Sequence, residues 1–274
     1  MSPTVSIILP AYNSAHLIAR SIDSVLAQSF QEWELLIIDD GSTDGTGAVA
    51  QSYVAREPRI RILTNTENRG VQYTLARGLK EATGELIARI DSDDAWLDHE
   101  KLAKQVAFLK THPDYVLLGT GAIISDEKGS ELLRFLPPET DEVIRARLLM
   151  KNCFMHASVM FRKDMAIKAG GYDQTEATRH IEDYDLWLKL GSIGKLANLP
   201  IYGISFLSRR TAVSAKNRSA QFYRTIGLIK KYKGNYPGYI SGLVTAHARY
   251  YLYSIFTMLP ASFRNMFLRF YKQF

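Results

Sequence analysis

The stretch ELLIIDDGSTDGT, residues 34–46, changes abruptly from apolar to acidic and turn-forming residues. Residues 34–38 have the short apolar pattern of a buried strand, which Asp39-Asp40-Gly41-Ser42 ends. Ser42 or Thr43 can cap a helix that continues to about residue 55. The stretch therefore predicts a strand, then a turn that carries two carboxylates, then a helix.

The same strand–turn–helix order flanks this stretch on both sides. Thr4–Leu9 has the pattern of a buried strand, and the turn Pro10–Asn13 precedes a helix with apolar residues at helical spacing. Further strands are predicted at 59–63 and 85–90, and a further helix at 71–82. This alternation predicts an α/β fold with a mainly parallel sheet and helices on both faces.

Polar clusters come directly after three of the predicted strands, at Pro10–Asn13, Asp39–Asp40 and Asp91–Asp94. In parallel α/β sheets, ligands bind at the carboxyl ends of the strands. Because all three clusters fall at that edge, the sequence predicts a binding site there.

The second half of the chain is less regular. Its patterns predict helices near residues 98–111, 141–150 and 181–190, and strands at 115–124 and 156–162. From about Arg218 the sequence becomes helical, aromatic and basic. We therefore expect one α/β domain over residues 1–217 and a helical extension over residues 218–274.

The composition is that of a globular protein. Of 274 residues, 46% are apolar and 23% are charged, which excludes a wholly disordered chain. Cys153 is the single cysteine, so the chain can form no internal disulfide, and a reducing compartment is expected. The sequence has neither a signal-peptide pattern nor an apolar run of membrane-spanning length, and a cytoplasmic location is therefore predicted.

The charge is divided sharply along the chain. Asp185 is the last acidic residue, and residues 186–274 hold 14 Lys and Arg. Such a basic tail suggests contact with phosphate in a membrane, a lipid carrier or a nucleic acid. A basic-aromatic helix can lie on the anionic inner face of the cytoplasmic membrane. The alternative is a helical subdomain that packs on the rest of the chain or in a homodimer.

Two acidic turns have the residue types of a metal and nucleotide site. Asp91-x-Asp93-Asp94 can hold a hard divalent cation such as Mg²⁺ or Mn²⁺, or can form a solvated turn with a helix cap. Asp40 can accept hydrogen bonds from a ribose hydroxyl or a base N–H, or can cap a helix.

Later residues suggest acid–base and phosphate chemistry. Glu182-Asp183-x-Asp185 opens a helix and offers a general base, although acidic residues there also stabilise the helix dipole. Arg209-Arg210 suits a diphosphate, or forms a solvated basic loop. His156 is either a site residue or a structural histidine.

Other nucleotide and hydrolase signatures are missing from the sequence. It has no P-loop, Gly119-x-Gly121 lacks the third glycine of a dinucleotide fingerprint, and a Ser-His-Asp site has no nucleophile elbow.

Several motifs, taken in order, resemble the family 2 glycosyltransferases with a GT-A fold, of the bacterial envelope and exopolysaccharide type. The resemblance covers about residues 4–215 and rests on these segments: PAYN at 10–13, SVLAQ at 24–28, ELLIIDDGSTDGT at 34–46, NRG at 68–70, ATGE at 82–85, RIDSDDAW at 89–96, GGYD at 170–173 and EDYDLW at 182–187. Each segment alone is weak, but the combination is specific.

The resemblance implies an inverting, metal-dependent transfer from a nucleotide-diphosphate sugar, often a UDP-sugar, to a hydroxyl of a saccharide or lipid-linked acceptor. It implies a nucleotide-sugar half over about residues 1–96 and an acceptor half over about 97–217. The implied donor-binding residues are Pro10, Tyr12, Asn13, Asp40, Asp91, Arg209 and Arg210. The implied metal ligands are Asp93 and Asp91, and the implied catalytic base is Asp183, with Glu182 as second candidate. His156 and Asp94 are implied to lie on the acceptor or diphosphate side.

Two other function classes compete with this interpretation. A sugar-phosphate nucleotidyltransferase would need a glycine-rich basic loop for a nucleoside triphosphate, and Leu9–Ser14 offers none. A non-catalytic module could bind a membrane or a nucleic acid through the basic tail. The acidic character of residues 1–185 argues against nucleic acid.

Overall fold

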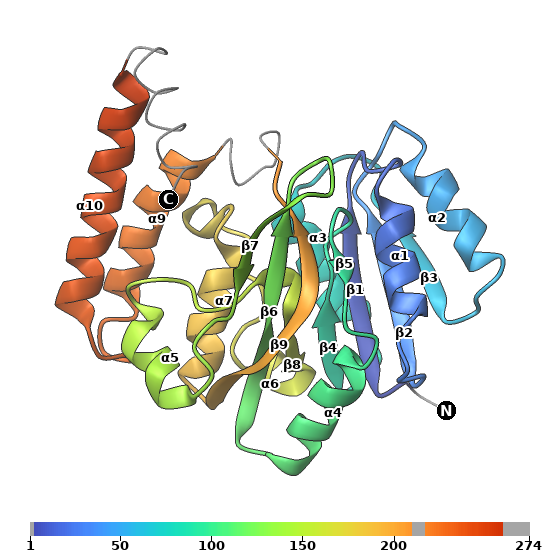
Figure 1. The fold of residues 1–274 in the computed structure, drawn as a ribbon, viewed down its shortest axis with the longest axis horizontal. Helices are drawn as coiled ribbons and strands as arrows, with labels where there is room; N and C mark the ends of the chain where they lie inside the picture. The colour runs from blue at the N-terminus through green and yellow to red at the C-terminus, as the bar shows by residue number, and fades with distance from the viewer. Residues whose placement is uncertain (1–2, 210–216, 260–274) are drawn as a thin grey trace.

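One sheet of nine strands runs through the protein (Figure 1), seen in a computed structural model that describes residues 3–209 and 217–259. Its first part is parallel, in the order β3 (Ile60–Thr64), β2 (Trp33–Asp39), β1 (Val5–Ala11), β4 (Leu86–Arg89). The predicted strand–helix alternation is therefore confirmed. The parallel order places the carboxyl ends of β2, β1 and β4 side by side.

The rest of the sheet is mixed in direction. Beyond β4 follow β8 (Met160–Arg162), β6 (Tyr115–Ser125), β9 (Lys195–Leu207) and β5 (Ala95–Trp96), and β7 (Glu131–Phe135) pairs with β6. Strand β6 runs parallel to β9 and antiparallel to β7 and β8. These strands extend the sheet sideways from β4, on the side opposite β1, β2 and β3.

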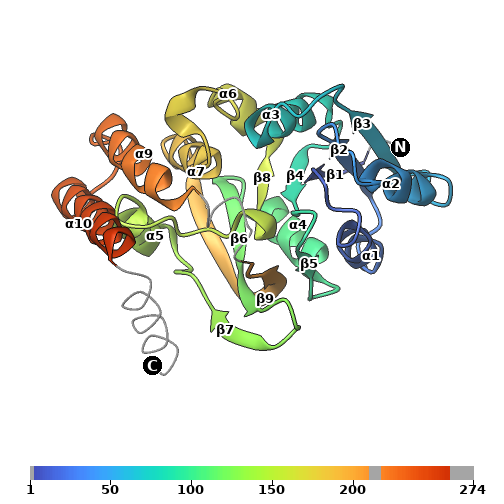
Figure 2. The same ribbon diagram turned by 90° about the horizontal axis from the view of Figure 1, so that it is seen from above.

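Helices cover both faces of the sheet (Figure 2). Val5, Ile7 and Leu9 of β1 share one core with α1 (Ile18–Leu26), α2 (Thr46–Val54) and α4 (Lys101–Thr111). Ile8 of the same strand points the other way, into a core with α3 (Val71–Glu81), α6 (Lys163–Lys168) and α7 (Glu182–Gly191). Successive side chains of a strand face opposite sides, so a continuous apolar run fills both layers.

Several elements differ from the sequence-based prediction, which did not include β5, β7, β9 or α6. The sequence did not indicate β9, because Pro200 and Gly203 interrupt its apolar pattern. The register passes from Leu199 to Tyr202, so Pro200 sits in an irregularity where the ladder does not need its missing N–H. Residues 156–162 are only partly strand, since His156–Ser158 forms a 3₁₀ turn before β8.

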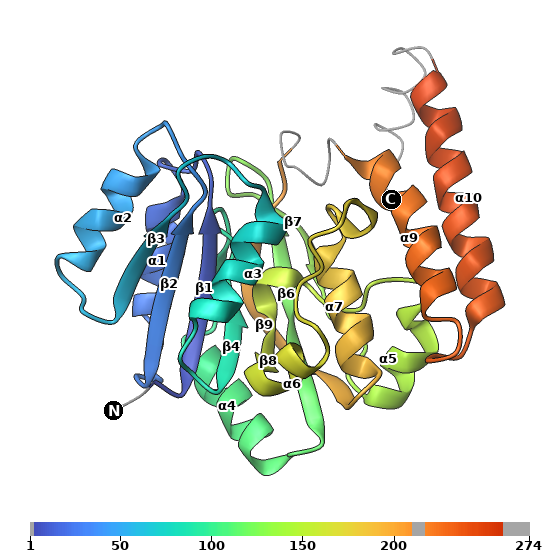
Figure 3. The same ribbon diagram turned by 180° about the vertical axis from the view of Figure 1, so that it is seen from behind.

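The helical extension packs against the part of the α/β domain that contains α7 (Figure 3). Helix α9 (Arg218–Lys231) contributes Leu228 to the core that contains α7, and the segment after it adds Tyr232 and Tyr236. Helix α10 (Tyr239–Met258) lies beside α9 and near α5 (Asp141–Leu148). The boundary at residue 217 stays a prediction, and residues 260–274 lie outside the described part.

None of the helices in the described part of the chain has the length and apolar character needed to cross a bilayer.

Candidate active site

Asp40 follows β2 at the carboxyl edge of the sheet and is only 4% exposed. Its carboxylate accepts hydrogen bonds from Asn65 Nδ2 at 2.6 Å and from the backbone N–H groups of Arg69 and Gly70 at 3.0 and 2.8 Å. These contacts fix the loop that begins α3. Asp40 therefore braces the edge of the predicted base-binding region.

Gly41 permits this close approach of two loops. Its φ angle is 71°, in the left-handed region, and a Cβ at this position would lie 2.6 Å from the backbone carbon of Glu67. Only glycine fits such a turn without displacing the neighbouring chain.

The loop after β1 carries the predicted base-binding residues. Pro10 is within β1, Tyr12 follows the strand and is 49% exposed, and Asn13 has a φ angle of 47°. Asn13 accepts the Thr43 backbone N–H at 2.9 Å, and its own N–H donates to the Ser42 hydroxyl at 3.0 Å. The ring of Tyr12 is thus left available beside a braced turn.

Arg89 is a fully buried cation at the end of β4, beneath the acidic turn. Its guanidinium donates to Asp91 Oδ1 at 2.7 Å and to the Ile8 carbonyl at 3.0 Å. Burial alone would raise the pKa of Asp91, but the electrostatic interactions with Arg89 and His156 and the hydrogen bond from Arg89 together outweigh burial and lower it. Arg89 therefore keeps Asp91 ionised and fixed at the sheet edge.

Asp93 faces Arg209, which follows β9. The guanidinium of Arg209 forms an ion pair with Asp93 Oδ2. Burial and the charge of Asp91 raise the pKa of Asp93, although Arg209 opposes that rise. The structure thus brings together Asp91, Asp93 and Arg209 from distant parts of the chain. Arg210, the other predicted arginine, lies outside the described residues.

Asp94 points away from the turn and into the protein. It is 1% exposed, and its Oδ1 accepts the backbone N–H of Leu207 in β9 at 3.0 Å. Burial and the neighbouring charges of Asp91 and Asp93 raise its pKa well above the usual range. The hydrogen bond ties the acidic turn to β9, and the predicted role of Asp94 on the acceptor or diphosphate side stays a prediction.

His156 belongs to the network around Arg89. Arg89 Nε donates to His156 Nε2 at 3.0 Å, and the Tyr172 hydroxyl lies 3.2 Å from the same nitrogen. Burial and the charge of Arg89 lower the pKa of His156 to about 3, so the imidazole is neutral. These contacts fit the structural interpretation of His156 better than a direct contact with phosphate.

Asp183 lies in the first turn of α7, and Asn152 Nδ2 donates to its Oδ2 at 3.1 Å. Burial raises the pKa of Asp183 to about 6, opposed by hydrogen bonds from the Tyr184 N–H and Asn152, and the charge of Asp91 contributes to the rise. The two carboxylates therefore lie within electrostatic range of each other. A carboxyl with this pKa is ionised at neutral pH and remains a competent base.

The two neighbouring carboxylates of α7 differ from Asp183. Glu182 is 6% exposed, and burial with the charge of Asp183 raises its pKa to about 8, so it is mostly protonated at neutral pH. Asp185 is fully buried and accepts Lys231 Nζ and Tyr232 Oη, both at 2.9 Å. Asp183 is therefore the best base of the three.

Sequence reasoning missed two residues of this site. Arg89 could have been found, because a charged residue inside the buried strand LIAR needs a charged partner. Asn152 carried no such signal, since it stands alone in a turn after α5 and only the fold brings it to Asp183.

The residues at the acidic turn fit a divalent cation. Among residues 3–209 and 217–259, no group of three or more His, Cys, Asp or Glu side chains could hold a metal ion. Mg²⁺ and Mn²⁺ sites, however, commonly use one or two carboxylates plus the phosphates of a substrate. Burial and then repulsion from Asp91 raise the pKa of Asp93, and a bound cation would relieve that repulsion.

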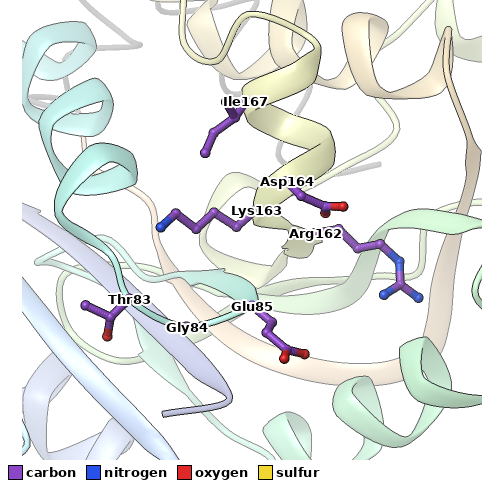
Figure 4. A pocket seen from close by; sticks show the side chains of 7 residues that line it. All are labelled: Thr83, Gly84, Glu85, Arg162, Lys163, Asp164 and Ile167. Atoms are coloured by element: carbon purple, nitrogen blue, oxygen red, sulfur yellow. The ribbon is translucent and has the colours of Figure 1, made fainter. Parts of the chain in front are cut away.

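A cavity of about 510 Å³ lies away from the acidic turn, at the start of β4 and the end of β8 (Figure 4). Lys163 and Arg162 extend in opposite directions there. Lys163 Nζ donates to the Ala82 carbonyl at 2.5 Å, and the Arg162 guanidinium donates to the Tyr115 and Leu109 carbonyls at 2.9 and 2.6 Å. Both cations are occupied by backbone groups, so the carboxyl edge remains the better candidate site.

The fold and these residues form an α/β protein with acidic side chains gathered at the carboxyl edge of a parallel sheet and a further carboxylate, Asp183, at the start of a later helix. The profile of the family described as "Glycosyl transferase family 2" matches residues 6–169, more than half of the chain. The protein belongs to glycosyl transferase family 2, as its motifs predicted, and it is thus a glycosyltransferase.

Two relatives illustrate this membership. EpsE of Bacillus subtilis (strain 168) is 40% identical over 188 residues, which are 68% of this chain and 66% of EpsE. The UDP-Glc:alpha-D-GlcNAc-diphosphoundecaprenol beta-1,3-glucosyltransferase WfgD of Escherichia coli is 31% identical over 222 residues, 81% of this chain and 82% of WfgD.

The structural comparison confirms the predicted fold. Mannosyltransferase PcManGT from Pyrobaculum calidifontis, solved with GDP-Man and Mn²⁺, matches with a TM-score of 0.68 at 20% identity. The match covers 100% of this chain and 81% of that protein.

Proposed function

We propose that this protein is an inverting glycosyltransferase of cell-envelope, capsule or exopolysaccharide synthesis. It moves a sugar from a nucleotide-diphosphate sugar, preferably a UDP-sugar, to a hydroxyl of a saccharide or lipid-linked acceptor. The observation that carries the proposal is the ionised, half-buried Asp183 at the start of α7, near enough to Asp91 for their charges to interact. WfgD supports the donor and acceptor classes, because its name describes UDP-Glc as donor and a lipid-linked diphosphate sugar as acceptor.

The donor occupies the carboxyl edge of the sheet. Tyr12 and Asp40 border the base and ribose, with Pro10 and Asn13 shaping the turn beside them. Asp91 and Asp93 hold Mn²⁺ or Mg²⁺, which would act as a Lewis acid on the donor diphosphate when bound. PcManGT, whose solved structure contains Mn²⁺ and GDP-Man, supports this cofactor class. Arg209 contributes a further positive charge to the leaving diphosphate.

Asp183 acts on the acceptor. Its ionised carboxylate accepts the proton of the acceptor hydroxyl while that oxygen bonds to the anomeric carbon, and the bond from that carbon to the nucleoside diphosphate breaks. Attack from the side opposite the leaving group inverts the anomeric configuration. Asn152 orients Asp183, whereas Asp94 holds β9 in place and His156 belongs to the Arg89 network.

The proposal is tested by a screen of nucleotide sugars for metal-dependent hydrolysis and thermal shift. One nucleotide sugar should stabilise the protein and be hydrolysed slowly with Mn²⁺ or Mg²⁺ present, and Asp183→Asn should stop hydrolysis while preserving the thermal shift. If no nucleotide sugar stabilises the protein in the presence of either metal, the proposed donor class is wrong.

We propose in addition that the enzyme works in the cytoplasm, at the inner face of the cytoplasmic membrane, with α10 as the contact. Helix α10 exposes an apolar row, namely Ile240, Val244, Tyr251, Leu252, Ile255 and Met258. Residues 186–274 contain no acidic side chain, so anionic lipid attracts this part of the chain. The competing occupant of the same row is a second copy in a homodimer.

A further inference from the structure

A second cavity, of about 240 Å³, lies beside the candidate base. One wall is formed by the end of β7 and the segment after it, from Phe135 to Pro138. The other wall is formed by Arg147 in α5 and by Lys151–Cys153, which follow that helix. This volume is too small for a complete lipid-linked sugar and suits one headgroup-sized part of a ligand. The cavity is separate from the acidic edge that the donor occupies.

The chemistry of this cavity favours an anion. Arg147 and Lys151 are exposed and form no ion pair with any carboxylate in the described residues, whereas the nearby Arg145 pairs with Asp141 at 2.7 Å. The Lys151 ammonium lies 5.1 Å from the centre of the Phe135 ring, on the cavity wall. Both cations act electrostatically on the thiol of Cys153, and all three residues line the cavity.

The position of the cavity assigns it to the acceptor. Asn152 lines the cavity and also donates to Asp183 Oδ2 at 3.1 Å. An anion bound here is therefore separated from the base by a single side chain. Asp91 and Asp93 would repel this anion from the donor edge, which is already committed to the donor diphosphate.

An apolar surface lies on one side of the cavity, and helix α10 lies on the other. Edge strand β7 and the residue after it expose Leu132, Leu133 and Leu136. On the other side, α10 contacts the end of α5, where Arg249 donates to the Met150 carbonyl at 2.7 Å. Figures 1 and 2 both place α5 between β7 and α10. A ligand with an anionic group and a long apolar chain matches this combination.

We propose that this cavity binds the diphosphate of a polyprenyl-diphosphate-linked acceptor. Arg147 and Lys151 pair with the diphosphate, its first sugar reaches past Asn152 to Asp183, and its lipid chain lies along the exposed leucines of β7. This inference rests on the proposed function and adds to it the place and chemistry of the acceptor site.

The test uses farnesyl diphosphate as a probe, measured by calorimetry with excess UDP and Mn²⁺ to fill the donor site. Farnesyl diphosphate should bind the wild-type protein, and farnesol at least about tenfold more weakly, since charge-assisted hydrogen bonds are lost. The double variant Arg147→Gln/Lys151→Gln should also lose about tenfold or more in affinity for farnesyl diphosphate. The matched double variant Lys110→Gln/Lys168→Gln removes the same charge elsewhere and should bind as the wild type does.

The possible outcomes separate this inference from the proposed function. Equal binding of farnesyl diphosphate by the wild type and the Arg147/Lys151 variant, or no binding by the wild type, overturns the acceptor site. Inorganic pyrophosphate that binds as tightly as farnesyl diphosphate overturns the lipid part. Binding of UDP with Mn²⁺, measured separately, should be the same in the Arg147/Lys151 variant as in the wild type. If the wild type does not bind UDP with Mn²⁺, that result instead contradicts the proposed donor site.

Discussion

Lys231 Nζ lies 2.9 Å from Asp185 Oδ1, so the C-terminal extension holds the helix that carries the candidate base. Two further contacts act on the segment just before that helix: Gln221 donates to the His180 carbonyl at 2.8 Å and Arg224 to the Arg179 carbonyl at 3.0 Å. His180 has a φ angle of 67°, a conformation that a non-glycine residue keeps only where its surroundings hold it. Helix α9 therefore positions the start of α7 and, with it, Asp183.

We predict that Asp185→Ala lowers the stability of the protein by about 3 kcal/mol, because it breaks a buried ion pair. Lys231 can turn to the solvent once its partner is gone, but Lys189, whose side chain is 15% exposed and whose Nζ lies 2.8 Å from Asp185 Oδ2, loses its ion-pair partner as well. Chemical denaturation measures the change. Lys195→Ala removes the exposed ion pair with Asp114 and should leave the transition unchanged. Equal effects of the two substitutions would show that Asp185 does not anchor α9.

We predict that Asp183→Asn reduces turnover at least about a hundredfold, the usual scale of general base catalysis. Donor binding should persist, because the donor contacts come from other elements. Glu182→Gln should keep turnover close to wild type, since burial already keeps Glu182 mostly protonated at neutral pH. Steady-state kinetics with isothermal binding of the donor nucleotide separates the two effects. The reverse result, with Glu182→Gln inactive, would move the base to Glu182.

The pH profile gives an independent check on the same assignment. Asp183 must be ionised to accept a proton, and its pKa is raised to about 6, so kcat/KM should be level at neutral pH and fall as the pH drops through about 6. A midpoint near 8 would indicate Glu182 instead. In Asn152→Ala the hydrogen bond that lowers the pKa of Asp183 is lost, and the midpoint should move to higher pH.

Strand ends and their carboxylates could be predicted from local pattern, because one side of the sheet is parallel and repeats a simple unit. The run before Asp40 and the run before Asp91 are both short, apolar and ended by acidic turns. Parallel order alone then places Asp40 and Asp91 at the same edge.

The remaining parts of the site depend on contacts that local pattern does not contain. Pro200 interrupts the sequence pattern of β9, so this strand is not predicted. The end of β9 nevertheless places Arg209 beside Asp93, and its Leu207 N–H donates to Asp94. Asp185 and Asp183 look alike in sequence, and the contacts of Asp185 with Lys231, Tyr232 and Lys189 are what distinguish the anchor from the candidate base. Such long-range pairing leaves no periodic signal in one sequence.

We predict that Asp93→Ala weakens binding of UDP in the presence of Mn²⁺ by at least about tenfold, because one oxygen ligand of the cation is lost. Calorimetry with UDP and Mn²⁺ measures the change, and the same titration without metal should show little difference between variant and wild type. Glu127→Ala, in the exposed turn between β6 and β7, is the matched control. Unchanged binding by Asp93→Ala would remove Asp93 from the metal site.

The proposed membrane contact of α10 predicts that the protein binds anionic lipid bilayers. The full chain should co-sediment with liposomes that contain anionic phospholipid and much less with neutral liposomes, and added salt should weaken the binding by screening the basic residues. Leu252→Glu/Ile255→Glu places charge on the exposed row of α10 and should abolish co-sedimentation. Ile167→Glu/Ile193→Glu changes exposed apolar residues elsewhere and should bind as the wild type does.

Gel filtration of the same variants distinguishes the alternative occupant of α10. If the row is a dimer contact, the α10 variant elutes later than the wild type, and neither protein binds liposomes of either composition. If it is a membrane contact, elution is unchanged and only liposome binding is lost. The two outcomes differ because a homodimer buries the apolar row in the absence of lipid, whereas a membrane contact buries it only when a bilayer is present.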